Sequence, residues 1–274
     1  MKHPIQKILI PVILFTLSIS LFSQGQREVD STRLVRVLTF NIFHGEIRYQ
    51  RADQLQKSNL DIVADVIRSA KPDIVALQEV DRNTERADGL DLVVELAMRT
   101  GMAPLFGSTM DFDGGEYGLG ILSCYSFRST KMHPLYSPPD TEPRGALEAN
   151  VILKSGDTIR FISTHFDHSR ETLVKINQAQ DINTLFASDQ KPSVLAGDLN
   201  ARPDSEPIGI LNKKWINSSR TNDPTSPSID PRSKIDYIMF RPEVRWRIIE
   251  SRVIDERVAS DHNPVLTVLE LLPE

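Results

Sequence analysis

The sequence contains very little cysteine, since Cys124 is the single one among 274 residues. One cysteine excludes an intramolecular disulfide, and no Cys-x-x-Cys or His-Glu-x-x-His pattern is present, so structural zinc sites and zinc-protease sites find no support. We expect Cys124 to be a small buried residue rather than a nucleophile. A packed core must therefore stabilise the fold, which is attainable at this chain length.

The sequence also lacks an excess of positive charge. It has 32 lysines and arginines against 37 acidic residues, which gives a formal net charge of −5 at pH 7. Because non-specific binding of nucleic acid depends on lysine and arginine side chains that neutralise phosphates, this balance weighs against tight binding of that kind. It does not exclude a nuclease, since a local basic patch can coexist with a negative whole.

The longest apolar run covers residues 8–22 and follows Lys2, His3 and Lys7. A basic start, an apolar stretch and small residues such as Ser23 and Gly25 behind it are typical of a secretory signal peptide. We therefore predict a signal peptide over residues 1–25 and a secreted or periplasmic protein. A retained N-terminal anchor is the alternative, although the run is shorter than the roughly 20 residues of a spanning helix.

Residues 26–274 alternate between strand-like and helix-like patterns, without a repeat or a linker that would divide them. Short apolar, β-branched runs predict strands over residues 34–40, 74–77, 118–123, 147–153, 158–163, 194–196, 235–240, 244–253 and 264–271. Apolar residues at helical spacing predict helices over residues 59–69, 90–99 and 173–186. The pattern predicts one α/β domain, with a polar surface loop over residues 218–231.

Polar residues follow these predicted strands at the points where we expect each strand to end. They are Asn41, Glu79, His165, Asp198, Asn200, Asp236, Asp261 and His262. Strand ends bounded by loops are where open α/β sheets collect ligands. Magnesium prefers oxygen ligands, with one or two carboxylates completed by water and substrate phosphate. The set is typical of a magnesium-assisted phosphoester hydrolase.

Six short motifs occur in a fixed order between residues 39 and 262: Thr-Phe-Asn-Ile (39–42), Leu-Gln-Glu-Val (77–80), Ser-Thr-His (163–165), Gly-Asp-Leu-Asn (197–200), Ile-Asp-Tyr (235–237) and Ser-Asp-His (260–262). In this order they resemble the endonuclease/exonuclease/phosphatase superfamily of metal-dependent hydrolases. The resemblance implies a four-layer α/β/β/α sandwich, with two packed mixed sheets, helices outside and the site at one edge. One position departs from the abasic-endonuclease branch, where Phe43 replaces an acid and His44 lies next to it.

The resemblance also implies roles for the residues that match its motifs. Glu79 would be the principal ligand of Mg²⁺ or Mn²⁺, with Asn41 beside it and Asp261 as a further carboxylate. Asp198 would orient or deprotonate the attacking water, and Asn200 would hold a phosphate oxygen.

The remaining roles concern the transition state. His262 would stabilise it or assist the leaving group, with Asp236 fixing the tautomer of its ring. His165 would donate to a non-bridging phosphate oxygen. Arg144 is a further candidate for phosphate contact, because a guanidinium matches two phosphate oxygens at once.

Several substrates remain open, since loops rather than core motifs select them. We favour a secreted phosphodiesterase that acts on nucleic acid. A sphingomyelinase-type enzyme that cleaves a phospholipid head group would need exposed aromatic side chains, for which Trp215 and Trp246 are available. An inositol or sugar phosphate phosphatase would need a tight basic pocket, and a non-catalytic binding module would need no intact ligand set. The sequence implies no stable protein partner, and we expect a monomer.

Overall fold

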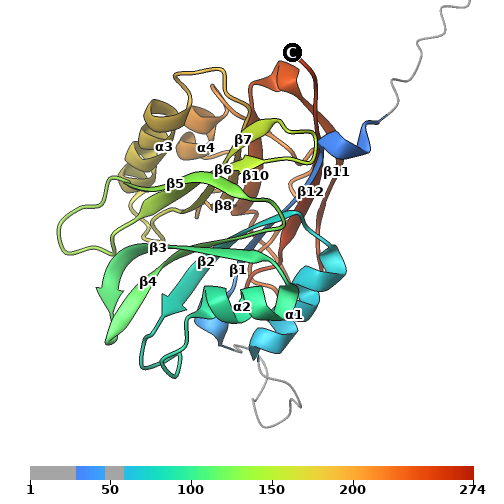
Figure 1. The fold of residues 1–274 in the computed structure, drawn as a ribbon. Coiled ribbons are helices and arrows are strands. Elements are labelled where there is room, and N and C mark those ends of the chain that lie inside the picture. Colours follow the sequence, from blue (N-terminus) through green and yellow to red (C-terminus); the bar gives the residue numbers. More distant parts are fainter. Residues whose placement is uncertain (1–28, 47–58) are drawn as a thin grey trace, which may run out of the picture.

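The computed structural model describes residues 29–46 and 59–274, and the predicted signal peptide over residues 1–25 lies outside them. Within the described residues, twelve strands form two six-stranded sheets, and four α-helices lie outside these sheets (Figure 1). None of the helices in this described part combines the length and the apolar character needed to cross a membrane.

The first sheet has the strand order β11-β12-β1-β2-β4-β3. Only β1 and β2 run parallel in it, and the other neighbours are antiparallel. Its strands are β1 (Leu34–Asn41), β2 (Ile74–Arg82), β3 (Ala103–Phe112), β4 (Gly115–Ser123), β11 (Trp246–Val253) and β12 (Val265–Leu271).

The second sheet has the strand order β5-β6-β7-β8-β10-β9. It is also mixed, because β7 and β8 are parallel while the other pairs are antiparallel. Its strands are β5 (Phe127–Pro134), β6 (Gly145–Ile152), β7 (Thr158–His165), β8 (Ser193–Asp198), β9 (Ile216–Asn217) and β10 (Asp236–Arg241).

Alternating side chains bury both faces of the central strands. In β1, Val37 packs into the core between the two sheets, while Leu38 and Phe40 point to the other face. That second face is covered by α1 (Asn59–Ala70) and α2 (Leu92–Thr100). Because successive side chains of a strand point to opposite faces of the sheet, one apolar run contributes to the cores on both faces.

The second sheet repeats this arrangement on its own outer face. There Leu195 of β8 packs against Ile182 of α3 (Thr172–Phe186) and Leu211 of α4 (Glu206–Leu211). Val194 points the opposite way, into the core between the sheets. The order of layers is therefore α/β/β/α, which confirms the predicted sandwich of two packed mixed sheets (Figure 1).

The structure corrects several details of the sequence analysis. Strands β3, β5 and β9 and helix α4 were not predicted, and β2 continues past Glu79 as far as Arg82. Cys124 is exposed rather than buried, so the expectation of a buried thiol is wrong. It follows Ser123, the last residue of β4, where the chain leaves the sheet.

Candidate active site

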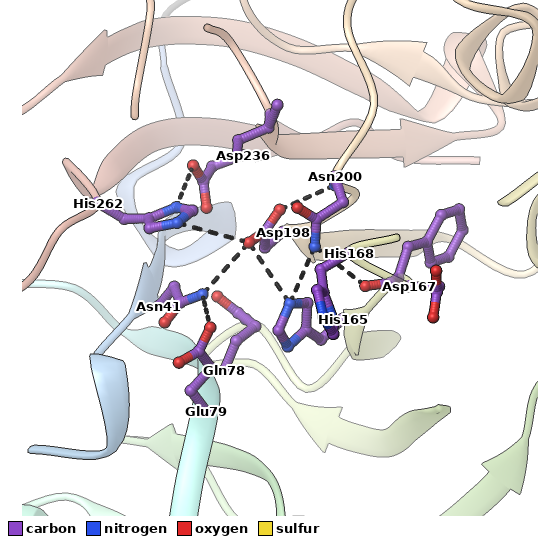
Figure 2. A network of polar contacts seen from close by, with 12 residues as sticks. Asn41, Gln78, Glu79, His165, Asp167, His168, Asp198, Asn200, Asp236 and His262 are labelled. Carbon is purple, nitrogen blue, oxygen red and sulfur yellow. Dashed lines mark hydrogen bonds and ion pairs between the residues drawn. The ribbon is translucent and has the colours of Figure 1, made fainter. Parts of the chain in front are cut away.

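The polar side chains converge where β1 and β2 of one sheet meet β7, β8 and β10 of the other (Figure 2). An open pocket of about 350 Å³ lies over them. Of the predicted site residues, those that line it are Glu79, Arg144, His165, Asp198, Asn200, Asp261 and His262. Asn41 and Asp236 are buried behind this lining and contact members of it.

Asp198 is the centre of the cluster, at the end of β8 and 1% exposed. Its Oδ1 accepts the backbone N–H of Asn200 at 2.8 Å, and its Oδ2 accepts Nδ2 of Asn41 at 3.2 Å. The Nε2 atoms of His165 and His262 lie 3.5 and 3.8 Å from the same Oδ2. Figure 2 shows these groups arranged around one carboxylate. Burial and the charge of Asp236 raise the pKa of Asp198 above its usual range.

Gly197 allows β8 to approach β7 closely just before this carboxylate. A Cβ at this position would lie 2.0 Å from the carbonyl oxygen of Thr164. Thr164 is the direct partner of Gly197 in the parallel ladder, and the next pair joins His165 with Asp198. The glycine therefore sets the spacing at which the two catalytic candidates meet.

His262 pairs with Asp236 through a hydrogen bond of 3.0 Å between Nδ1 and Oδ2. Burial opposes the charged ring, but the carboxylates of Asp236 and Asp198 outweigh it and raise the pKa of His262 to about 10. The ring is therefore protonated at neutral pH, and its Nε2–H faces Asp198. An imidazolium beside two carboxylates can donate a proton or stabilise negative charge.

The topology that brings these residues together differs from the predicted one. Asp236 was grouped with residues that end strands, but it begins β10, as the predicted strand over residues 235–240 implies, and it lies opposite Asp198 because β10 and β8 are antiparallel. Asp261 and His262 lie in the loop before β12. Ser260 fixes this loop, since its hydroxyl donates to the carbonyl of Asn41 at 2.6 Å and accepts the N–H of His262 at 3.1 Å.

Glu79 lies at a bulge in β2, where the pairing with β4 shifts between Leu77 and Val80. Its φ of 55° lies in the left-handed region that a non-glycine residue rarely adopts, a form of strain found at functional sites. A bulge redirects a side chain out of the ladder. Glu79 thereby reaches the pocket from the middle of a strand.

The carboxylate of Glu79 is held in its ionised form. Asn41 Nδ2 donates to its Oε1 at 2.9 Å, and Nδ1 of His44 lies 3.5 Å from its Oε2. Burial opposes ionisation, yet the contact with His44, the hydrogen bond from Asn41 and the charge of His262 lower the pKa of Glu79 below its usual range. A permanently charged carboxylate in an open pocket is the kind of ligand that a divalent cation needs.

The donor set fits a hard divalent cation on the side of Glu79 and Asp261, two carboxylate residues that line the pocket. Asn41 contributes differently, because its Oδ1 accepts the backbone N–H of Phe43 at 3.1 Å. Its amide nitrogen therefore faces Glu79 and Asp198, so it holds the two carboxylates in place. Its ligation of a metal stays a prediction.

A second group of possible ligand atoms comes from Asp198, Asp236 and His262, which lie within 4.8 Å of one another. Asp236 is 1% exposed and is not among the residues that line the pocket. The hydrogen-bonded geometry of this group suits proton handling better than metal binding.

Arg144 lies beside His165 in the wall of the pocket. Its Nη1 is 2.9 Å from Nδ1 of His165, and its Nη2 is 3.0 Å from Nδ1 of His168. Glu142 lies 3.0 Å from the same Nη1. Burial and the charge of Arg144 hold the pKa of His165 well below its usual range, so this ring is neutral. The predicted phosphate contact of Arg144 stays a prediction.

The pocket wall also contains residues to which the sequence analysis gave no role. Arg86 is held by two hydrogen bonds to Asp81, and its guanidinium lies over the rings of Phe112 and Tyr117 at 4.5 and 5.6 Å. His44 also lines this side. His44 could be noticed from the sequence because it follows Phe43, just after the motif at residues 39–42, but no sequence pattern marked Arg86 or Phe112.

Comparison with known proteins identifies the same family that the six motifs resemble. The profile of the Endonuclease/Exonuclease/phosphatase family matches residues 38–262. The fold is similar to an endonuclease/exonuclease/phosphatase structure from Beutenbergia cavernae, with 22% identity, a TM-score of 0.70, and coverage of 88% of this chain and 72% of that one.

Two further structures have the same fold. The mannosyl-6-phosphatase of Bacteroides thetaiotaomicron is 17% identical with a TM-score of 0.68, over 87% of this chain and all (100%) of that one. The human Nocturnin catalytic domain, solved with a bound sulfate anion, is 17% identical with a TM-score of 0.69, over 87% of this chain and 94% of that one.

Proposed function

The chain belongs to the endonuclease/exonuclease/phosphatase family, and on this premise we propose that it is a secreted, metal-dependent hydrolase of phosphoester bonds that favours phosphodiesters. The observation that carries the proposal is the environment of Asp198. One buried carboxylate lies at the meeting point of a charged histidine, a neutral histidine and a carboxamide. This arrangement can orient a water molecule and surround a phosphoryl group with N–H donors.

The two histidines have capacity left for a substrate. Their Nε2 atoms are 3.5 and 3.8 Å from Oδ2 of Asp198, which is longer than a good hydrogen bond. A phosphoryl oxygen could therefore accept from either, and at His165 it would take the place of the contact of 3.1 Å between Nε2 and Nδ2 of Asn200. In the proposed reaction Asp198 orients the attacking water, neutral His165 donates to a non-bridging oxygen, and charged His262 stabilises the developing charge. Asn200 stays the predicted contact of a second phosphate oxygen.

A divalent cation, Mg²⁺ or Mn²⁺, would be held by Glu79 with Asp261 and would supply positive charge to the phosphoryl oxygens. The pocket residues fit this requirement because Glu79 is ionised and faces the open pocket. The identity of the cation belongs to the proposal.

The structure supports some of the candidate substrates better than others. Trp215 and Trp246 are 1% and 5% exposed, so the two tryptophans considered for membrane contact by a sphingomyelinase lie in the core. A second candidate is a small phosphomonoester. The pocket of about 350 Å³, bounded by Phe43, Phe112 and Tyr117, is near the lower limit for a small-molecule site. A fold neighbour named as a mannosyl-6-phosphatase also supports this candidate.

A pair of chromogenic substrates tests the proposal and separates the two candidates. We expect the purified protein to hydrolyse bis-p-nitrophenyl phosphate with Mg²⁺ or Mn²⁺, to lose this activity in EDTA, and to act more slowly on p-nitrophenyl phosphate. The reverse preference would establish the phosphomonoesterase. No turnover of either ester with any divalent cation would contradict both and would favour a binding module.

The matched control for Glu79→Ala is Glu243→Ala, which removes an exposed carboxylate just beyond Arg241, at the opposite end of β10 from Asp236. This variant should keep the wild-type rate.

A further inference from the structure

The contacts of Arg144 differ from those expected of a side chain that is free to bind a phosphate. It is 4% exposed, and its backbone N–H donates to the hydroxyl of Ser137 at 2.9 Å. Its two terminal nitrogens are each directed at Nδ1 of a different histidine, His165 at 2.9 Å and His168 at 3.0 Å. One guanidinium therefore spans two imidazoles on the same wall of the pocket.

The chemistry of the guanidinium determines what these contacts are. An arginine side chain has five N–H donors and no acceptor. Nδ1 of each histidine must therefore be the nitrogen without a proton, and it accepts from Arg144. A neutral imidazole has one protonated nitrogen, so the proton lies on Nε2 in both rings. For His165, that Nε2–H faces Oδ2 of Asp198 at 3.5 Å.

The contact with Arg144 at Nδ1 decides between the two tautomers, because a proton on Nδ1 would lie 2.9 Å from a charged donor. At Nε2 the neighbours are mixed: Oδ2 of Asp198 accepts at 3.5 Å, whereas Nδ2 of Asn200, at 3.1 Å, is a neutral donor that also has the carbonyl of Phe166 as an acceptor at 3.1 Å. Burial increases the penalty at Nδ1, since His165 is 5% exposed and water cannot replace the lost contacts. Glu142, 3.0 Å from Nη1, places a negative charge beside the guanidinium.

We propose that Arg144 is a positioning residue that acts through His165 and His168. Its guanidinium holds both Nδ1 atoms as acceptors and so presents both rings to the pocket as Nε2–H donors. This differs from direct contact between Arg144 and the substrate phosphate. The effect on turnover rests on the proposed function, whereas the tautomer of His165 does not.

The tautomer is measured directly in the wild-type protein. The chain contains six histidines, so long-range ¹H–¹⁵N correlation of the ring nitrogens, with assignment through His165→Ala, is practical. We expect His165 to show an unprotonated Nδ1 and a protonated Nε2. A protonated Nδ1 on His165 would overturn the proposal even if the protein is an active hydrolase. The expected tautomer in an inactive protein would support it and would leave the proposed function as the part that fails.

A double-mutant cycle separates positioning from phosphate binding. Arg144→Met should lower kcat about 10- to 100-fold with little change in KM, as for other residues that orient a functional histidine. In the His165→Ala background the same substitution should lower kcat less than about twofold, apart from a small effect through His168, because the ring that Arg144 mainly positions is absent. A full loss in both backgrounds, or a rise in KM as the main effect, would show direct phosphate contact and overturn the proposal.

A conservative variant guards against failure to fold. Arg144→Lys keeps the buried charge and one donor but cannot span two rings. It should retain more activity than Arg144→Met. If Arg144→Met and Arg144→Lys were equally impaired while both remained folded, a donor to Nδ1 of His165 would not be what matters, and the proposal would fail.

Discussion

The pairing of His262 with Asp236 leads to a prediction about pH that the substitution Asp236→Asn tests. The pKa of His262 is about 10, well above the usual value near 6.5, because Asp236 at 3.0 Å and Asp198 outweigh the effect of burial. An opposite charge this close contributes about 1–3 pH units to a pKa. Without the charge of Asp236, His262 should therefore lose its proton between about pH 7 and 9.

The expected readout is the pH dependence of kcat/KM for bis-p-nitrophenyl phosphate from pH 6 to 9.5. The activity of the variant relative to wild type should fall as the pH rises through this interval, to a loss of about 10²–10⁴ where His262 is neutral. Asp88→Asn makes the same chemical change at an exposed position and is the control. If kcat/KM of the variant stayed within threefold of wild type up to pH 9.5, the role given to this pair would be refuted.

The same pair affects stability with a defined sign. A histidine whose folded-state pKa lies above its unfolded value stabilises the fold fully below about pH 6.5. That contribution is lost as the pH rises toward the folded value of about 10. Urea unfolding of the wild type should therefore show stability declining over this range, and Asp236→Asn should flatten the dependence.

The remaining predictions concern the central carboxylate and the ladder beside it. Asp198→Ala and His262→Ala should each lower kcat by about 10²–10⁴ while calorimetry still detects cation binding, and a near-wild-type rate in either would remove that residue from the mechanism. Gly197→Ala should destabilise the fold by about 3 kcal/mol or more in urea, because its Cβ would lie 2.0 Å from the carbonyl oxygen of Thr164. Gly209→Ala, in a helix with open space around it, should instead stabilise by about 0.5–1 kcal/mol, and equal effects of the two would contradict the packing argument.

The central strands could be predicted from sequence because their faces are buried on both sides. Strand β8 is six buried residues long, and its apolar run is continuous. Strands β3 and β5 were missed because each lies at the edge of its sheet and most of its side chains are partly or fully exposed. Such strands carry no continuous apolar run, so periodicity does not mark them. Helix α4 has only six residues, too few for a helical pattern.

The residues of the site were predictable as a set, but their arrangement was not. The motifs named Glu79 without the bulge that turns it into the pocket, since no local signal marks a shift in register between β2 and β4. The position of Asp236 opposite Asp198 could not be predicted, because the antiparallel pairing of β10 with β8 is a tertiary feature. The contacts of Arg144 with two histidines join the residue before β6 to the end of β7 and the segment after it, which a linear motif cannot describe.

The central claim is that Glu79 holds a divalent cation that phosphoester hydrolysis at this site requires. The most direct test compares the wild type and Glu79→Ala by calorimetric titration with Mg²⁺ and Mn²⁺ and by turnover of bis-p-nitrophenyl phosphate in the same buffer. The account predicts cation binding and turnover in the wild type and the loss of both in a variant whose thermal unfolding is otherwise normal. Metal-dependent turnover that persists in Glu79→Ala would contradict it.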